Sequence, residues 1–333
     1  MQSVRVYPSI TEVDQAEWAR VTDSAGASAF YDYAFLRAYE RFPLQDTDAF
    51  FYLMFGRPAV AIVPAYVQGT DDAIGMVAGL GLPGRLPGDR ILLTHVTHCY
   101  DTVVPALPGH SLTARACEAM ADLARQEGVK WFAFLNVDGA SSVAAELTAA
   151  GLAKIPMYIR FRANVGAYQG AEEFVAGVPG KKARYTLRRS HRRARDQGME
   201  IVSPDPADAA GAIELCRRTT ARHGTAGYYP DHFSDFVALA AGLVHVTEVR
   251  LDGRLASAAI CLRDRTRFHL WAGGLDHEVT EYVHNSFPLM LWSAVADAIR
   301  LGRPVLEAGR GNVAVKTHFG LSPVPLFAFV GQP

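Results

Sequence analysis

Three features that mark particular classes of protein are missing from this sequence. No apolar run approaches the ~18 residues that cross a bilayer, and the first 20 residues contain no apolar stretch of the kind that signal peptides carry. The four cysteines are scattered and form no CxxC pair. We therefore expect a cytoplasmic protein with reduced thiols, no membrane span, no disulfide framework and no zinc site.

A strong net charge and an abundance of lysine are also missing. The formal net charge of the 333 residues is −1, so any polyanionic partner must be held by a local patch of cations. Arginine supplies most of the positive charge, and lysine occurs only at positions 130, 154, 181, 182 and 316. Lys316 is the only lysine after Lys182, which singles it out.

The order of predicted elements repeats along the chain. The first half contains a hairpin, a helix, a buried strand, a second helix and another strand: Phe51–Gly69, Ser111–Gly128 with Ser111 as its cap, Val129–Val137, Ser141–Leu152 and Lys154–Val165. The second half has a hairpin around Asp252-Gly253, a helix at Ser286–Gly302 and a strand at Pro304–Arg310. At about 150 residues per domain, the length also predicts two domains.

We therefore predict an α/β (α+β) fold built from two copies of one module. Each copy is a mixed, mostly antiparallel sheet flanked by helices. The predicted domains are residues 1–165 and 166–333, with the boundary in the segment between Val165 and Gly180.

Positive charge is concentrated in the segment Gly180–Gly198, which holds eight Lys or Arg residues and no acid before Asp196. On a helix, Lys181, Arg184, Arg188, Arg192 and Arg195 share one face, Lys182, Arg189 and Arg193 form a second row, and Ala183, Leu187, Ser190 and Ala194 form a narrow stripe opposite. Tyr185 lies beside the basic face, where it can stack on a base or bond a phosphate. This is either a solvated surface helix or a site where a diphosphate, a coenzyme A phosphate or an RNA backbone neutralises the cations.

Three motifs follow one another in the second half: VPGKKARYTLRRSHRRARDQGMEIV, then HNSFPLMLWSAVADAIRLG, then VLEAGRGNVAVKTHFG. In this order they resemble the Fem-like aminoacyl and peptidyl transferases and the related tandem-domain N-acyltransferases of the GNAT superfamily. The resemblance covers about residues 165–325 and reaches the first half mainly through the order of elements. It implies two tandem GNAT-like domains, transfer of an acyl group to an amine, and no metal or redox cofactor.

The resemblance also implies a catalytic pair. Lys316 matches the family's lysine near the acyl carbonyl and the substrate phosphates, although it can also be read as a surface lysine. Glu307 stands at the family's acidic position, where it takes the proton of the attacking amine directly or through water. The alternative for Glu307 is a structural ion pair with Arg310 or Arg303.

Further candidates for substrate binding surround this pair. Arg310 and Asn312 flank glycines that allow close approach to a substrate or simply form a turn. His318 is a candidate base or a structural residue, and Trp271 lines an acceptor pocket or belongs to the core. Asn285 precedes the cap of a helix whose N-terminus is a ready anion site. His95, His98 and Asp101 have the spacing of metal ligands, but no second cluster supports a metal, and we expect none.

The choice of acyl donor depends on a missing motif. Acetyltransferases that use coenzyme A carry a glycine-containing loop that opens a helix and cradles the pyrophosphate. Neither EYVHNSF nor LPGHSLT, which open the two relevant helices, contains that pattern. We therefore expect aminoacyl-tRNA as the donor and a small amine as the acceptor, in cell-wall or specialised metabolism. Acyl-CoA-dependent N-acyl transfer and a non-catalytic nucleic-acid-binding protein are the alternatives.

Overall fold

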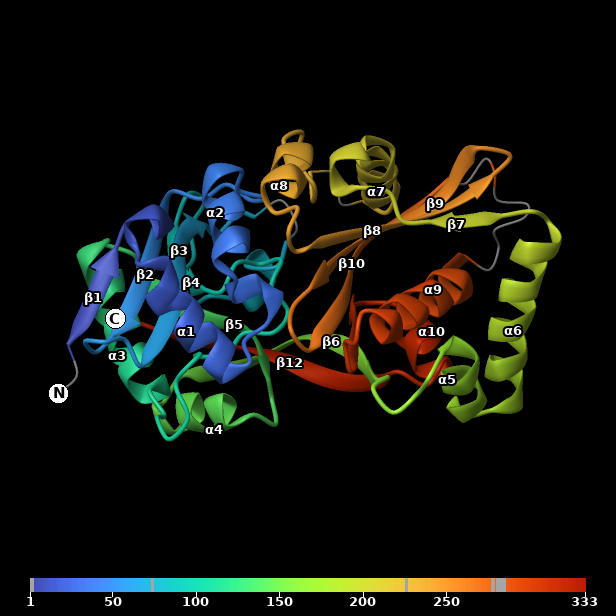
Figure 1. The fold of residues 1–333 in the computed structure, drawn as a ribbon. Coiled ribbons are helices and arrows are strands. Elements are labelled where there is room, and N and C mark those ends of the chain that lie inside the picture. Colours follow the sequence, from blue (N-terminus) through green and yellow to red (C-terminus); the bar gives the residue numbers. More distant parts are fainter. Residues whose placement is uncertain (1–2, 73–74, 225–226, 277–278, 280–285) are drawn as a thin grey trace. The chain divides into compact units, whose positions relative to one another are not determined.

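The computed structural model describes residues 3–72, 75–224, 227–276, 279 and 286–333, and the chain divides into two compact units (Figure 1). The first unit comprises Met1–Ile159 and Val324–Pro333, and the second comprises Arg160–Pro323. The division between Ile159 and Arg160 lies a few residues before the boundary that the sequence suggested. The return of the last residues to the first unit has no counterpart in the sequence prediction.

The first unit is a six-stranded mixed sheet with the order β1-β2-β3-β4-β5-β12, in which only β4 and β5 pair in parallel. Its strands are β1 (Val4–Tyr7), β2 (Ala49–Phe55), β3 (Ala61–Gly69), β4 (Arg90–Thr94), β5 (Trp131–Asp138) and β12 (Ser322–Gly331). Its helices are α1 (Gln15–Ala25), α2 (Tyr33–Arg41), α3 (Thr113–Gln126) and α4 (Ser142–Ala149), with short 3-10 turns η1 (Ile10–Glu12), η2 (Ala29–Tyr31) and η3 (Ala78–Leu80).

Helices cover both faces of this first sheet, which explains why β3 and β5 are almost continuously apolar. On one face, Met120 of α3 and Leu147 of α4 pack against Phe132 and Phe134 of β5. On the other, Trp18 of α1 meets the ring of Tyr52 edge-on at 5.9 Å between centroids. The first unit therefore has a closed hydrophobic core on each side of its sheet.

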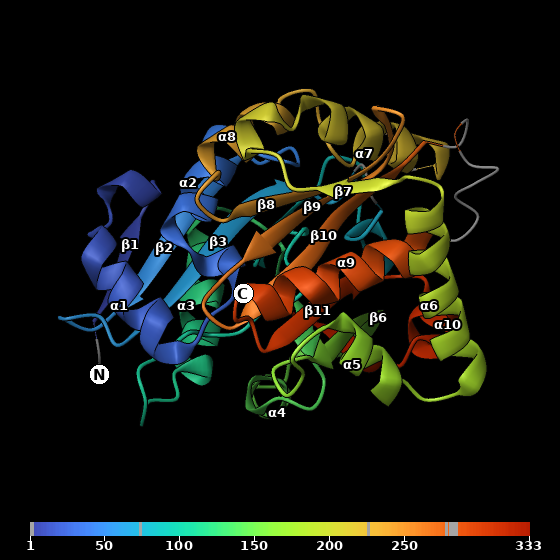
Figure 2. The same cartoon turned by 45° about the vertical axis from the view of Figure 1, so that its right-hand side comes forward.

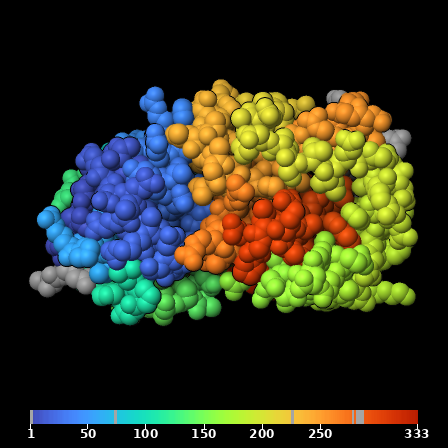
Figure 3. Space-filling model, viewed as in Figure 1, coloured from blue at the N-terminus to red at the C-terminus, as the bar shows by residue number. Residues whose placement is uncertain are grey.

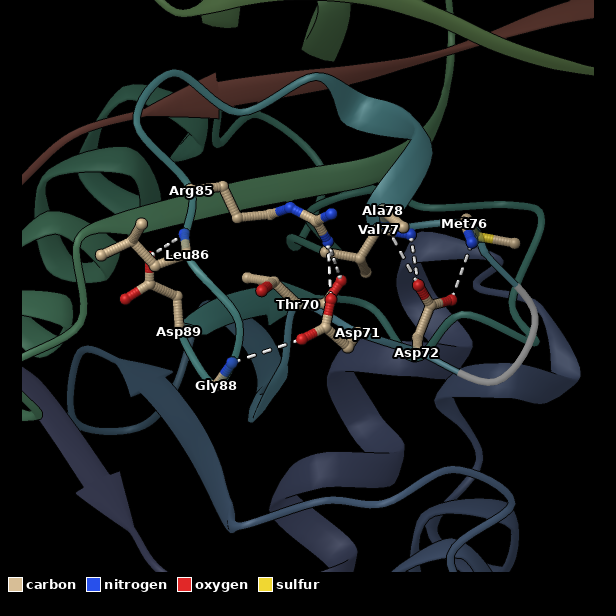
Figure 4. A network of polar contacts seen from close by, with 10 residues as sticks. All are labelled: Thr70, Asp71, Asp72, Met76, Val77, Ala78, Arg85, Leu86, Gly88 and Asp89. Atoms are coloured by element: carbon tan, nitrogen blue, oxygen red, sulfur yellow. Dashed lines mark hydrogen bonds and ion pairs between the residues drawn. The ribbon is translucent and has the colours of Figure 1, made fainter.

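A polar network ties the loop after β3 to the segment that leads into β4 (Figure 4). Asp72 accepts hydrogen bonds from the backbone N–H groups of Met76, Val77 and Ala78, with distances of 2.8–3.1 Å. Arg85 donates to Thr70 O at 2.9 Å and to Asp71 at 3.0 Å. These side chains satisfy backbone groups that lie outside the sheet ladder.

The second unit repeats the arrangement, with strand order β7-β8-β9-β10-β11-β6 and a single parallel pair, β10 and β11. Its strands are β6 (Ala153–Asn164), β7 (Glu200–Val202), β8 (Val244–Leu251), β9 (Arg254–Arg263), β10 (Arg267–Leu275) and β11 (Val305–Arg310). Its helices are α5 (Ala171–Gly177), α6 (Lys181–Asp196), α7 (Ala210–Arg222), α8 (Phe233–Leu239), α9 (Ser286–Arg300) and α10 (Val313–His318), with the 3-10 turn η4 (Pro206–Asp208). Helix α9 packs on one face of this sheet and α7 on the other (Figure 2).

The last strand of each sheet comes from the other half of the sequence. Strand β6 follows β5 along the chain but pairs with β11, whereas β12 follows β11 but pairs with β5. The two units thus have the same topology with their closing strands exchanged. The predicted α/β class and the predicted repeat of one mixed, mostly antiparallel module are confirmed.

Most elements expected from the sequence form where they were predicted. The hairpin turn at Asp252-Gly253 is confirmed, with φ values of 50° and 76° at the two residues, and Ser141 caps α4 by accepting from Ala144 N. The predicted cap of α3 is wrong. Ser111 Oγ instead donates to the Glu146 carboxylate at 2.7 Å, and Leu112 occupies the cap position.

Helix α7 lies so close to β10 that one strand position admits only glycine. A Cβ on Gly274 would lie 2.6 Å from the backbone of Leu215 and Cys216, and that backbone belongs to a helix. The neighbouring Gly273 faces the flexible end of Met290, whose Cε would lie 3.2 Å away. Gly274 therefore sets the separation between α7 and the sheet.

Substituting this glycine tests the close approach. Gly274→Ala should lower the stability of the protein by roughly 2–3 kcal/mol, because the helix backbone must shift to admit the methyl group. Gly273→Ala is the matched control and should change stability by less than about 1 kcal/mol, because a methionine end adapts cheaply. Urea unfolding followed by circular dichroism measures both, and equal midpoints for the two variants would contradict the packing described.

Candidate functional site

The end of β11 is shaped by three residues with positive φ that turn the chain into α10. Gly309, Gly311 and Asn312 have φ values of 65°, 78° and 51°, a conformation that glycine and asparagine tolerate best. Together with Arg310, which lies between the two glycines, they bring the chain back toward β11. The glycine-rich turn predicted here therefore positions the residues that follow it.

Lys316, on α10, directs its side chain back to that turn. It is only 4% exposed, and its Nζ donates to the carbonyl oxygen of Arg310 at 2.9 Å. The ammonium also lies 5.6 Å from the centroid of the Phe161 ring. Burial, and secondarily the charge of Arg310, lower the pKa of Lys316 to about 8. Lys316 is thus a buried cation and not a solvated surface lysine.

Glu307 and Arg310 project from the same face of the sheet. Glu307 pairs with Arg162 and Arg310 with Arg160, and these partners are two positions apart on β6. An irregularity in β11 between Glu307 and Arg310 makes this shared direction possible. Glu307 is 1% exposed and Arg160 is 4% exposed. Glu307 and Arg160 are therefore buried on one face of the sheet, whereas Lys316 lies beside Phe161, whose side chain alternates to the other face of β6.

A histidine on the neighbouring strand adjoins Glu307 on this face. His269 of β10 is the register partner of Glu307 and is completely buried. Its Nε2 lies 3.0 Å from Oδ2 of Asp264. Although burial raises the pKa of Asp264, the hydrogen bond and charge of His269 outweigh it and hold that pKa at about 2. Asp264 therefore stays ionised and fixes the ring of His269.

An aromatic cluster after α7 lies on the same side. The Arg310 guanidinium donates to the hydroxyl of Tyr228 at 3.3 Å. Tyr229 stacks on Phe233 with centroids 4.4 Å apart, and the Trp271 ring lies 5.7 Å from that of Phe233. Trp271 is half-buried, so it belongs to this cluster and also keeps part of its surface accessible to solvent.

The basic segment forms α6 with the predicted orientation. Its buried residues are Ala183, Leu187, Ser190 and Ala194, which confirms the small-residue stripe. The exposed cations are Lys181, Lys182, Arg189, Arg192, Arg193 and Arg195.

Three of the α6 arginines have partners within the protein, and one of them, Arg195, lies 3.7 Å from the carboxylate of Asp196. Arg184 donates to Val178 O at 2.8 Å, and Arg188 bonds Glu172 of α5 at 2.6 Å. Tyr185 is 56% exposed, with the Arg189 guanidinium 6.0 Å from its ring centroid. The surface that α6 offers to an anion is therefore built mainly from its outer row of cations.

The remaining predicted residues lie in different settings. Asn312 and His318 are exposed at the start and end of α10, and the ring of His318 meets that of Phe319 edge-on at 5.0 Å. Asn285 lies outside the described residues. In the first unit, His95 is buried with its Nε2 2.9 Å from Phe30 O, and burial lowers its pKa to about 3. Among the described residues, no three His, Cys, Asp or Glu side chains are placed to hold a metal.

Strands β4 and β5 of the first unit correspond to β10 and β11, but they carry no buried ionisable side chain. The buried residues of β4 and β5, both fully described, are apolar apart from Thr94 and Asn136, and neither of these ionises. The buried Glu307 and His269 therefore have no counterpart on those strands. In the first unit, the nearest buried ionisable residue is His95, which directly follows β4.

Sequence reasoning missed Arg160, His269 and Tyr228. Arg160 and Arg162 alternate with Ile159, Phe161 and Ala163, a pattern that predicts an exposed polar face. Arg162 is exposed as that pattern indicates, but Arg160 is buried. Both residues pair with β11, Arg162 with Glu307 and Arg160 with Arg310, and this pairing has no local sequence signal.

Comparison with known proteins relates this site to a family. Residues 181–317 match the family model described as an acetyltransferase (GNAT) domain. Comparison with curated proteins finds no match. Across the part of the chain that the structure describes, no helix has the length and apolar character needed to cross a membrane.

Solved structures share the fold across the whole chain. FemX aligns with 96% of this chain and 96% of its own, with a TM-score of 0.65 and 11% identity. The C-terminal domain of a putative lysylphosphatidylglycerol synthetase from Agrobacterium fabrum covers 98% of this chain and 93% of its own, with a TM-score of 0.62 and 14% identity. A tandem GNAT protein from the clavulanic acid biosynthesis pathway covers 99% and 98%, with a TM-score of 0.56 and 14% identity.

These likenesses establish a common fold, and the family match covers α6 through most of α10, including Glu307, Arg310 and Lys316. The buried groups at the end of β11 therefore lie inside the matched domain. Residues 181–317, somewhat less than half of the chain, match the acetyltransferase (GNAT) domain model, and this match supports an acyltransferase.

Proposed function

We propose that the protein forms an amide bond by transferring an amino acid from aminoacyl-tRNA to the amine of a small acceptor. The observation that carries this proposal is the buried ammonium of Lys316 at the end of β11. Burying a cation costs solvation free energy. A protein that keeps one buried is therefore expected to need its charge for function. An acyl transfer uses it, because negative charge develops on the carbonyl oxygen when the amine attacks.

Each step of the reaction has a residue of the second unit to perform it. The acceptor amine attacks the ester carbon, and Lys316 and Arg310 stabilise the oxygen that becomes negative. Glu307 accepts the proton that the amine loses on forming the amide bond. When the carbon–oxygen bond to the donor breaks, that proton returns to the departing ribose oxygen. His269 and Trp271 border the site and shape the acceptor position.

Two observations favour tRNA as the donor. The resemblance to Fem-like transferases implies aminoacyl-tRNA, and the outer cations of α6 can track a phosphate backbone. The segments that open α3 and α9 also lack the glycines of a coenzyme A cradle. A protein that takes charged tRNA works in the cytoplasm, and the four buried free cysteines agree with that location.

Acyl-CoA-dependent N-acyl transfer is the second candidate. The family model is named for acetyltransferases, and the tandem GNAT protein of the clavulanic acid pathway is described as solved without AcCoA. Under this candidate the same Lys316 and Glu307 act, but the leaving atom is a sulfur. The two candidates differ only in the donor.

Degrading the tRNA with RNase tests whether charged tRNA is the acyl donor. Incubation with charged tRNA and a panel of small amines should give an amide product, and pretreatment with RNase should abolish it. Acetyl-CoA alone is the parallel reaction and should give no product. Product formation that survives RNase, or that depends on acetyl-CoA, would refute the tRNA proposal.

Lys316→Met should remove activity while stabilising the protein. The folded-state pKa of about 8 lies below the ordinary lysine value, so the unfolded chain binds the additional proton between about pH 8 and 10.5. The buried ammonium therefore destabilises the fold below pH 8, and stability rises with pH through that window. The Met variant should gain up to about 3 kcal/mol at pH 7, and this gain should shrink above pH 10.

The turnover of the same variant should fall by about 10²–10³-fold, as for the loss of one oxyanion donor. Lys154→Met is the matched control, because Lys154 is an exposed lysine of the first unit. That control should leave turnover unchanged. A Lys316→Met variant with normal turnover would exclude the assigned role.

Charge removal on α6 should weaken tRNA binding in a salt-dependent way. Replacing both Arg192 and Arg193 with Ala should lower the slope of log affinity against log salt concentration by about 1 for each phosphate that the variant no longer neutralises. Replacing Arg115 and Arg125 of α3 with Ala removes the same charge from the first unit and should leave the slope unchanged. Filter binding over a salt series measures both, and identical slopes for the two double variants would rule out the α6 surface.

A further inference from the structure

A groove of about 410 Å³ lies between α6, β7 and α9 in the second unit. Its walls include His191 of α6, Ile201 of β7, and Trp292 and Arg300 of α9. In the space-filling view, the atoms of α9 lie directly beside those of α5 and α6 (Figure 3). None of Glu307, Arg310 and Lys316 lines this groove. It is therefore a second cavity, distinct from the site at the end of β11.

Two stacked rings form one wall of the groove. His191 and Trp292 have centroids 4.2 Å apart and an interplanar angle of 10°. Trp292 is 9% exposed, whereas His191 is half-buried and remains accessible. Burial, and then the charge of Arg195, lower the pKa of His191, which disfavours the protonated ring. A further planar ring can extend this stack.

An exposed apolar side chain supplements the ring wall. Ile201 is 41% exposed and lines the groove from β7. A large aliphatic side chain left open to water within a cavity favours a ligand with an apolar face. The volume lies within the range of about 300–1,000 Å³ that small-ligand sites occupy.

The charges around the groove favour an anion at its rim. Asp297 lies in the wall, but its Oδ1 is bonded by Arg300 at 2.8 Å, and its Oδ2 lies 3.0 Å from His245 and 3.1 Å from Thr247. Glu172, the acid whose charge also reaches His191, is bonded by Arg188. The exposed Arg192 and Arg195 lie on the turn of α6 after His191. Arg300 bonds Asp297, and the Arg195 guanidinium lies 3.7 Å from the Asp196 carboxylate, so these two arginines can offer their remaining N–H groups to an anion.

We propose that this groove binds one nucleotide of the acyl donor, with the base stacked on His191 and its phosphate near Arg195 and Arg300. This inference rests on the proposed function, because it requires a donor that carries a nucleotide. Stacking on an aromatic ring beside cations is how single-stranded nucleic acid is held without sequence preference. The 3′ end of a tRNA and the adenosine phosphate of coenzyme A share this chemistry, and the experiment separates them.

The test compares a short fluorescein-labelled single-stranded RNA with an abasic oligomer of the same length and charge. Fluorescence polarisation should show that the wild-type protein binds the base-containing RNA about 5- to 150-fold more tightly, since stacking contributes about 1–3 kcal/mol per base. His191→Ala should abolish this preference, and His191→Phe should retain it, because phenylalanine restores a stacking surface. His223→Ala changes an exposed histidine after α7 and is the matched control.

Competition identifies the source of the nucleotide. If unlabelled coenzyme A displaces the RNA from wild-type protein but not from His191→Ala, the groove takes the coenzyme's nucleotide. If only RNA competes, it takes the tRNA end. Equal binding of the base-containing and abasic oligomers by the wild-type protein would overturn the inference, as would a base preference that survives in His191→Ala.

The same experiment separates this inference from the proposed function. RNase-resistant turnover together with a His191-dependent base preference refutes the tRNA donor and leaves the groove as a nucleotide site. RNase-sensitive turnover with binding that does not depend on His191 refutes the groove alone. If His191→Ala does not fold, His191→Leu takes its place, because leucine keeps the bulk of the side chain but offers no ring for a base to stack on.

Discussion

The ammonium of Lys316 lies where water cannot fully solvate it. The turn after β11 and helix α10 hold it in that position. The turn from Gly309 to Asn312 takes up positive φ values so that α10 can aim this side chain at the carbonyl of Arg310. The bulge in β11 turns Arg310 to the face that already carries Glu307. Without an incoming negative charge, the buried cation lowers stability, which is typical of groups retained for chemistry and not for folding.

The two units share one topology but differ in the side chains on their parallel strands. Both have a single parallel pair within an otherwise antiparallel sheet, and both receive their closing strand from the other half of the sequence. In the first unit, the strands of the parallel pair are packed with apolar side chains such as Leu93 and Ala133. In the second, His269 and Glu307 occupy the last register pair of the corresponding strands. Two units of the same topology thus differ in the ionisable side chains that they carry, so the fold alone does not determine the chemistry.

Sequence patterns predicted most helices and strands, because these elements depend on residues that are close together in the sequence. The stripe from Ala183 to Ala194 and the Asp252-Gly253 turn required only helical or hairpin geometry. The exchange of β6 and β12 was not predictable, since strand pairing over such sequence distances leaves no periodic signal. Arg160, which alternation alone places on an exposed face, is buried on one of these exchanged strands. Lys316 and Glu307 were found through composition and resemblance, but the burial of Lys316 depends on the short α10, which no pattern indicated.

Direct titration of Lys316 tests the central claim most simply. The chain has only five lysines, so ¹³C-labelled lysine should give a small set of NMR signals that single substitutions can assign. We predict that one signal, absent from Lys316→Met, titrates with a pKa of about 8. A Lys316 signal that titrates near the ordinary lysine value of about 10.4 would contradict the account, because the ammonium would then be solvated and not held for the reaction.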